Sequence, residues 1–233
     1  MTARAVLTDI EGTTTDLAFV RDVLFPLARR EIPAYVRARF DDPSLAPLRA
    51  AIARDVGASA DAASGVSAGA AIDRLMLWMD EDRKETHLKQ LQGELWRAAY
   101  ADGSMRAHVY PDVRPAFERW TAAGHRVFVF SSGSVDAQRL IFGHSTDGDL
   151  TPYLSGYFDT VVGPKREPAS YRTIADRIGA LPGDVLFLSD VIAELDAARA
   201  AGMRTGALLR PGVPAPPPSS THPTHRTFET IEP

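Results

Sequence analysis

The chain of 233 residues contains no cysteine. This absence excludes disulfide bonds, thiolate catalysis and cysteine-ligated zinc, and it agrees with a cytoplasmic location. An excess of positive charge is missing too, because 26 Lys and Arg residues stand against 30 Asp and Glu residues, for a formal net charge of -4. Bulk electrostatics therefore give no reason to expect binding to nucleic acid or to a membrane surface.

Long hydrophobic runs are also absent. The first apolar run, Ala5–Leu7, is followed at once by Thr8 and Asp9, so we expect no signal peptide. No segment approaches the length of a membrane span. We therefore expect a cytoplasmic protein whose length suits a large domain, or a core domain with a smaller cap.

Short apolar segments alternate with helical patterns through much of the chain. Strands are predicted at Ala5–Leu7, Val127–Phe130, Phe158–Val162, Val185–Leu188 and Thr205–Leu209. Helices are predicted at Val113–Ala123, Ala169–Ile178 and Ile192–Ala201. This alternation predicts an α/β fold, a Rossmann-like parallel sheet with helices on both faces.

Residues 16–107 follow a different pattern. Helical spacing extends over Val20–Phe40, Pro43–Asp55, Ala70–Asp82 and Lys84–Tyr100. We therefore predict an all-helical cap inserted between the first and second strands of a core formed by residues 1–15 and 108–233. The proline-rich stretch Pro211–Pro223 is predicted to be irregular surface chain, with His222 and His225 exposed to solvent.

Two carboxylates follow the first predicted strand. Asp9 and Glu11 lie two residues apart, so in an extended segment their side chains point the same way, and Gly12 permits a sharp turn after them. Such a pair suits a hard cation, or a nucleophile beside an acid/base. By itself the short pattern is better explained as a strand followed by a polar turn, because short patterns recur by chance.

Polar side chains follow the other predicted strands as well. Ser131–Ser134 lies at a strand-to-helix turn, where hydroxyls and backbone N–H groups form an anion site. Asp190 and Glu194 follow another strand, and Lys165 lies in a loop after the weakest one. Because strand carboxyl ends meet at one edge of an open α/β sheet, we expect these groups to share a site.

These segments resemble the four motifs of the haloacid dehalogenase-like phosphohydrolase superfamily, with Glu11 where most members have a second aspartate. Asp9–Thr14 resembles in particular the enolase-phosphatase (acireductone synthase) family of methionine salvage. Further matches to that family are Phe130–Val135, Phe142–Thr146, Ser170–Arg172, Phe187–Val191, Asp82–Lys84 and Leu88–Gly93. Together the matches extend from about residue 6 to about residue 212.

The resemblance implies a role for each matching residue. Asp9 would be the nucleophile, and Glu11 would protonate the leaving alkoxide and then activate water. Ser131, Ser132 and Gly133 would hold the phosphate. Lys165 would neutralise its charge.

A metal site is implied in the same way. Mg²⁺ would be held by Asp9, by the side chain or backbone carbonyl of Glu11, and by Asp190. Glu194 would support the site by orienting water or a neighbouring group.

The implied reaction is enolisation of 2,3-diketo-5-methylthiopentyl 1-phosphate, then removal of its phosphate to give the acireductone. Glu11 is a candidate enolisation base because it reaches further than aspartate, and the sequence leaves that assignment open. The other interpretations are a plain Mg²⁺-dependent small-metabolite phosphatase and a noncatalytic phosphometabolite-binding protein. The resemblance suggests a monomer.

Several other polar residues have two interpretations. Lys84, Lys89 and Gln92 of the cap either contact substrate or form a solvated helix face. His144 is more readily explained as a residue that structures its loop than as an acid/base.

Overall fold

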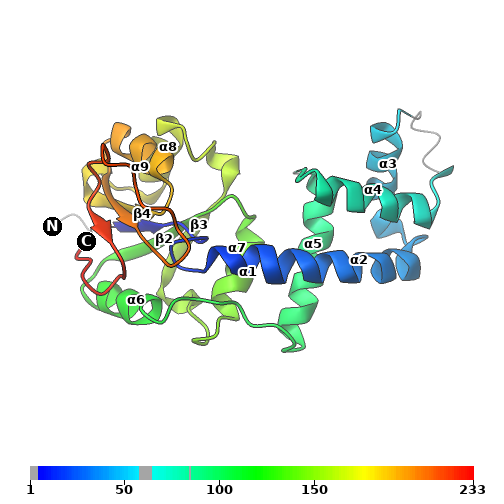
Figure 1. Cartoon of the computed structure of the whole chain (residues 1–233), viewed down its shortest axis with the longest axis horizontal. Helices are drawn as coiled ribbons and strands as arrows, with labels where there is room; N and C mark the ends of the chain where they lie inside the picture. Colours follow the sequence, from blue (N-terminus) through cyan, green and yellow to red (C-terminus); the bar gives the residue numbers. More distant parts are fainter. Residues whose placement is uncertain (1–4, 58–64, 84) are drawn as a thin grey trace. The chain divides into compact units, whose positions relative to one another are not determined.

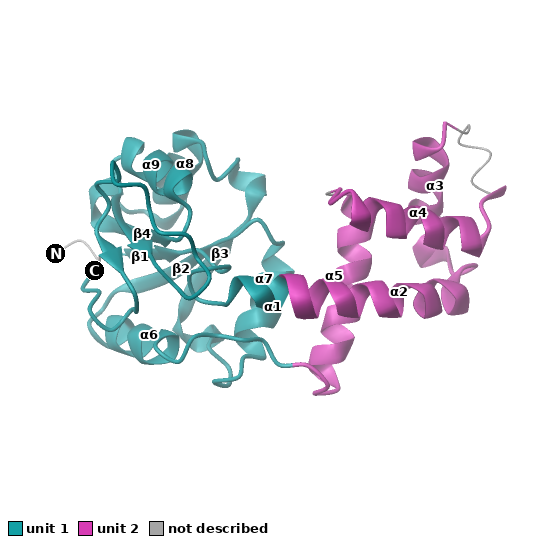
Figure 2. Cartoon of the chain, viewed as in Figure 1, with its two compact units in different colours: residues 1–20, 106–233 teal, residues 21–105 magenta. Residues whose placement is uncertain are grey.

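The computed structural model describes residues 5–57, 65–83 and 85–233, and the chain divides into two compact units. Unit 1 comprises residues 1–20 and 106–233, and unit 2 comprises residues 21–105 (Figure 2). The sequence had suggested junctions at residues 15/16 and 107/108, a few residues from those of the compact units.

Unit 1 is built on a six-stranded sheet in the order β3-β2-β1-β4-β5-β6. Its strands are β1 (Ala5–Thr8), β2 (Arg126–Phe130), β3 (Leu154–Phe158), β4 (Val185–Ser189), β5 (Arg204–Leu208) and β6 (Thr224–His225). All neighbouring strands are parallel. The predicted parallel α/β core is therefore confirmed, whereas the two-residue β6 is too short to leave a pattern in the sequence.

The predicted strand Phe158–Val162 is wrong, because β3 already ends at Phe158. The carboxylate of Asp159 accepts a hydrogen bond of 3.0 Å from the backbone N–H of Val161. This cap turns Thr160–Val162 into a 3₁₀ turn instead of a continued strand. Two further 3₁₀ turns in unit 1 are Thr151–Tyr153 and Pro182–Asp184.

Helices cover both faces of the sheet (Figure 1). The helices of unit 1 are α1 (Leu17–Phe19), α6 (Val113–Ala122), α7 (Val135–Gly143), α8 (Pro168–Ile178) and α9 (Ile192–Ala200). On one face, α8 and α9 bury Tyr171 and Leu195 against strand residues such as Phe187. On the other face, Phe117 of α6 packs against Phe142 of α7, with ring centroids 6.1 Å apart.

The described residues of unit 2 form helices joined by short turns, with no strand among them. A π-helical turn, Val20–Leu24, leads into α2 (Phe25–Arg39), a 3₁₀ turn (Pro43–Leu45), α3 (Ala46–Asp55), α4 (Ala68–Asp80) and α5 (Thr86–Ala101). The apolar stripes around Leu75, Trp78 and Leu91 form its core. They are therefore packing surfaces, as helical spacing predicts.

The chain after β5 is irregular but not uniformly exposed. His222 was expected in solvent, and that prediction is wrong, because the residue is only 5% exposed. Its Nε2 lies 2.9 Å from Asp196 Oδ1, and its Nδ1 lies 2.7 Å from Thr205 Oγ1. The reason is that β6 pairs with β5 and draws the tail against the sheet. His225 is half-buried, and burial lowers its pKa.

Among the described residues, no helix is long and apolar enough to cross a membrane.

Candidate active site

The predicted site residues of the core gather at the carboxyl edge of the sheet. Asp9 follows β1 directly, and β1 pairs with β2 on one side and β4 on the other. Ser131 follows β2, and Asp190 follows β4. A central strand with a neighbour on each side thus brings three strand ends together, which is where open α/β sheets bind ligands.

Lys165 makes two short ion pairs at this edge. Its Nζ lies 2.7 Å from Asp9 Oδ1 and 2.7 Å from Glu194 Oε2. All three side chains are buried. Burial disfavours the ammonium, but the charges of Asp9 and Glu194 outweigh it and raise the pKa of Lys165 above its ordinary value. The site therefore has a fixed positive charge beside the predicted nucleophile.

The backbone around Lys165 is held from α8. The hydroxyl of Tyr171 donates a 2.7 Å hydrogen bond to the carbonyl of Lys165, and Ser170 Oγ donates to that of Pro164, also at 2.7 Å. The segment Ser170–Arg172 resembles the family in sequence, but the resemblance assigned no role to Tyr171. These bonds fix the loop that carries the lysine, and thereby the direction of its long side chain.

Asp190 packs against the turn after the first strand. Gly12 has a φ of 68°, and a Cβ built on it would lie 2.3 Å from Asp190 Oδ2. Only glycine satisfies both the left-handed backbone and this close approach. Within the described chain, Asp190 Oδ1 is buried without a hydrogen-bond partner. Burial and then the charge of Asp9 raise the pKa of Asp190 to about 7.

This environment fits a divalent cation. Asp9 and Asp190 are like charges that repel each other, and an oxygen of Asp190 lacks a donor. No group of three His, Cys, Asp or Glu side chains in the described residues forms a complete metal site. The side chain of Glu11 is exposed. Two carboxylates with a backbone carbonyl, such as that of Glu11, are the hard oxygen donors that Mg²⁺ takes together with water.

The serine-rich turn after β2 offers hydrogen-bond donors. Ser131 is tied in place, because its N–H donates to the carbonyl of Phe158 at 3.1 Å and its Oγ accepts from the N–H of Gly133 at 3.3 Å. Within the described residues, Ser132 makes no hydrogen bond. Its hydroxyl and N–H are thus available to an anion.

Gln138 is a supporting residue that sequence reasoning missed. This buried side chain of α7 donates to the carbonyls of Gly133 and Phe158 at 2.9 and 2.8 Å. It thus joins the serine-rich turn to the end of β3. A single glutamine in a helix leaves no signal of a side-chain bond to distant backbone, so only the tertiary structure reveals it.

Glu194 lies inside the site, with its carboxylate bound by Lys165 and by Ser189. Ser189 Oγ is 3.2 Å from Glu194 Oε2 and 3.4 Å from Asp9 Oδ2. Burial, followed by the charge of Asp9, raises the pKa of Glu194 to about 7. The position suits a residue that orients Lys165.

The remaining candidates from the sequence are His144 and three residues of the helical cap. The carbonyl of His144 accepts a 2.9 Å hydrogen bond from the N–H of Ala107, so this residue helps to shape its loop. In unit 2, Lys89 is exposed and Gln92 is buried. Lys84 lies outside the described residues.

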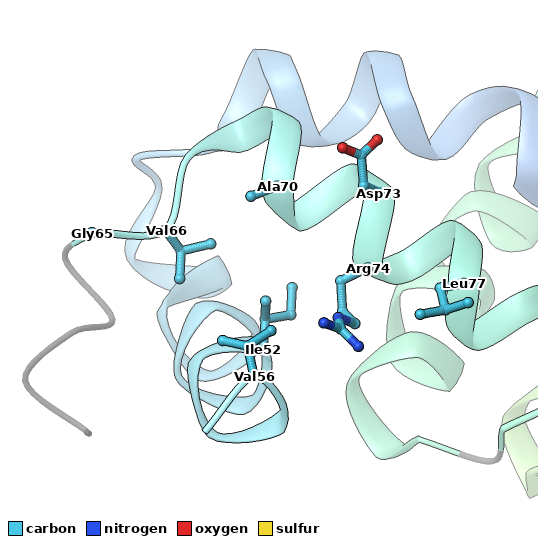
Figure 3. A pocket seen from close by; sticks show the side chains of 8 residues that line it. All are labelled: Ile52, Val56, Gly65, Val66, Ala70, Asp73, Arg74 and Leu77. Atoms are coloured by element: carbon cyan, nitrogen blue, oxygen red, sulfur yellow. The ribbon is translucent and has the colours of Figure 1, made fainter. Parts of the chain in front are cut away.

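One hollow in unit 2 lacks this chemistry. It is a cavity of about 530 Å³ between α3 and α4, shown in Figure 3. Its lining is mainly apolar, with Ile52, Val56 and Leu77 beside the charged Arg74. Its charged lining residues are Asp73 and Arg74, and Arg74 pairs with Asp55 at 3.2 Å.

Comparison with known proteins identifies relatives of this chain. A sequence model of haloacid dehalogenase-like hydrolases matches residues 3–202. Enolase-phosphatase E1 of Sorangium cellulosum (strain So ce56) is 54% identical over 231 residues, which cover 99% of this chain and 98% of that protein. Enolase-phosphatase E1 of Pseudomonas aeruginosa (strain UCBPP-PA14) is 50% identical over 231 residues, or 99% of each chain.

Solved structures agree with these sequence matches. The crystal structure of the UTR4 protein of Saccharomyces cerevisiae is 33% identical, with a TM-score of 0.84, and covers 99% of this chain and 100% of that one. CbbY from Rhodobacter sphaeroides in complex with phosphate has a TM-score of 0.59 at 16% identity, covering 97% and 95% of the two chains. The similarity to CbbY concerns the fold alone.

Proposed function

The chain belongs to the enolase-phosphatase family of the haloacid dehalogenase-like hydrolases, and on that basis we propose how its residues carry out the reaction. The enzyme enolises 2,3-diketo-5-methylthiopentyl 1-phosphate and then removes its phosphate, yielding the acireductone of methionine salvage. The observation that carries the proposal is the buried contact of Lys165 with both Asp9 and Glu194, beside Asp190.

Phosphoryl transfer begins with Asp9. A carboxylate oxygen of Asp9 attacks phosphorus and forms an aspartyl-phosphate, while Glu11 protonates the departing enolate oxygen. Glu11 then takes a proton from the water that hydrolyses the aspartyl-phosphate. The side chain of Glu11 is exposed, as a residue that exchanges protons with substrate and water must be.

The phosphate is bound by groups from two other strand ends. Ser131 is fixed in its turn, and Ser132 supplies free donors. Lys165 places its ammonium between the incoming phosphate and the carboxylates. Positioning and charge stabilisation of this kind account for most of the rate enhancement in phosphoryl transfer.

Asp9, Asp190 and the carbonyl of Glu11 would hold Mg²⁺, which when bound offsets the repulsion between carboxylate and phosphate and polarises substrate oxygens. Enolisation also requires a base near the carbon that carries the phosphate ester. We assign this role to Glu11, with Lys165 and Glu194 as the next residues to test. Unit 2 is proposed as the cap that excludes water and contacts the thioether end of the substrate.

The test is a turnover assay on the diketone phosphate that follows the enol ultraviolet band and phosphate release separately. Asp9→Asn should reduce phosphate release by several orders of magnitude, because an amide is a poor nucleophile. Asp176→Asn, which changes an exposed aspartate of α8, is the matched control and should leave the rate unchanged. Normal phosphate release by Asp9→Asn would remove Asp9 from its assigned role.

The same assay separates the other interpretations. A plain phosphatase would release phosphate from generic phosphomonoesters as fast as from the diketone phosphate, without an enol signal. A noncatalytic binding protein would turn over neither in the presence of Mg²⁺. The monomeric state and the cytoplasmic location stay predictions.

A further inference from the structure

Arg210 is a buried arginine just beyond β5, at the same edge of the sheet as the active site. It is 4% exposed. No motif in the sequence drew attention to it, and the proposed reaction leaves it unused. A buried guanidinium needs partners for its charge, so the groups around Arg210 show what it does.

One partner lies in the loop that carries the active-site acids. Arg210 Nε donates a 2.9 Å hydrogen bond to the carbonyl oxygen of Thr13. Thr13 follows Gly12, whose Cα approaches Asp190 so closely that no side chain fits there. The bond therefore fixes a peptide group adjacent to the contact between the loop and Asp190.

The rest of the guanidinium is anchored away from the loop. Its two terminal nitrogens, Nη1 and Nη2, each lie 2.9 Å from an oxygen of Asp112. Asp112 also accepts a 2.6 Å hydrogen bond from the N–H of Phe228. The guanidinium carbon lies 4.3 Å from the ring centroid of Tyr110 and 4.9 Å from that of Phe228. This anchoring leaves Arg210 little freedom to move.

A second bond holds the loop from the same side. The N–H of Tyr110 donates to the carbonyl of Thr14 at 2.9 Å. Consecutive carbonyls of the loop are thus bound by Arg210 and by Tyr110, whose ring also stacks on that arginine. The two bonds together set the orientation of the backbone that follows Glu11.

We propose that Arg210 is a positioning residue for the loop from Asp9 to Thr15, and that its Nε–H bond to Thr13 sets the placement of Glu11 and Gly12 for phosphoryl transfer. The inference rests on the proposed function. A lysine at this position would keep the positive charge near Asp112 but lacks the planar fork that also reaches Thr13.

The central experiment compares Arg210→Lys with Arg119→Lys. Arg119 is the control, because within the described residues its side-chain hydrogen bonds go to the tail, to the carbonyls of Phe228 at 2.9 Å and Ile231 at 3.4 Å. Arg210→Lys should lower kcat by about 10- to 100-fold with KM little changed, since small misplacements near reacting groups have effects of that size. Arg119→Lys should change neither constant.

A second readout does not depend on activity. Loss of the guanidinium bond should shift the carbonyl-carbon resonance of Thr13 and the amide of Thr14 in NMR spectra of Arg210→Lys. The same resonances should stay in place in Arg119→Lys. If the wild-type chain releases no phosphate, the proposed function fails, and the Thr13 resonance alone decides whether Arg210 positions the loop.

The outcomes that overturn the inference are specific. An unchanged kcat and an unmoved Thr13 resonance in Arg210→Lys would reduce Arg210 to an anchor of the tail. Equal losses of kcat in the two arginine variants would do the same. If Arg210→Lys does not fold, Asp112→Asn weakens the anchor while keeping its shape, and it should give the same kcat loss and the same shift.

Discussion

Lys165 Nζ lies 2.7 Å from Asp9 Oδ1, although the two residues belong to the two separate chain segments of unit 1, residues 106–233 and 1–20. The ammonium is shared with Glu194, also at 2.7 Å. Two buried carboxylates therefore depend on one cation. The following predictions test this arrangement and the groups around it.

Lys165→Met should abolish phosphate release and also destabilise the fold. Removing one partner from a buried ionic group leaves uncompensated charge and costs about 3–5 kcal/mol. The free energy of unfolding, measured with urea, checks the value. Lys89→Met, at an exposed lysine of α5, is the control for stability and should have little effect.

The double variant Lys165→Met/Glu194→Gln extends this test. Glu194→Gln neutralises one of the carboxylates that lose their cation in Lys165→Met. The loss of unfolding free energy in the double variant should therefore be about 0.5–3 kcal/mol smaller than the sum of the two single losses. Strict additivity would contradict the shared ion pair.

Gly12→Ala should impair both stability and activity. A left-handed residue with a side chain costs about 1–2 kcal/mol, and here the new methyl would also press on Asp190, 2.3 Å away. Gly179→Ala is the matched control, because its φ of 65° is similar and its Cβ would meet nothing within 4 Å. Urea unfolding should show the larger loss for Gly12→Ala, and only Gly12→Ala should raise the Mg²⁺ concentration needed for half-maximal turnover.

The stability of the metal-free protein should fall as pH rises from about 4 to about 7. Asp190 and Glu194 have pKa values raised to about 7 by burial and by the charge of Asp9. A raised carboxyl pKa means that the folded state holds its proton where the unfolded state has lost it, so the stabilisation present at low pH disappears through this interval. Thermal unfolding across that range, in the presence of a chelator, measures the effect.

Asp190→Asn tests the role of the Asp190 carboxylate by removing its charge. The variant should be more thermally stable than wild type without metal at pH 8, by about 2–4 °C for each kcal/mol regained. It should also lose most of the stabilisation that Mg²⁺ gives to the wild-type protein, because an anionic ligand has become neutral. An equal Mg²⁺-dependent shift in both proteins would count against Asp190 as a ligand.

Glu11→Asp should affect the two chemical steps unequally. The substitution retains a carboxylate but withdraws it by about one bond, and proton transfer needs a base within roughly 3 Å of its target. If Glu11 serves enolisation, the rate on the diketone phosphate should fall further than the rate on a generic phosphomonoester. Glu11→Gln, which removes the acid/base altogether, should lower both. Equal losses with aspartate would confine Glu11 to phosphoryl transfer.

The amino-acid sequence determined the family, the parallel core and most of the acidic, basic and hydroxyl groups at its carboxyl edge. It could do so because Asp9, Ser131 and Asp190 each follow a short apolar strand directly, and parallel strands bring such ends together. The helical spacing of unit 2 was readable for the same reason, since local periodicity reports which face is buried.

Contacts between distant segments were decided only by the tertiary structure. Examples are the burial of His222, the hydrogen bond from Arg210 to Thr13, and the hydrogen bond from Gln138 to Gly133. In each case packing decides which groups surround the side chain. The end of β3 at Phe158 was likewise set by the cap that Asp159 provides. Such bonds have no period and no fixed spacing along the chain, so physical chemistry specifies them only once the sheet and its helices have brought the partners within reach.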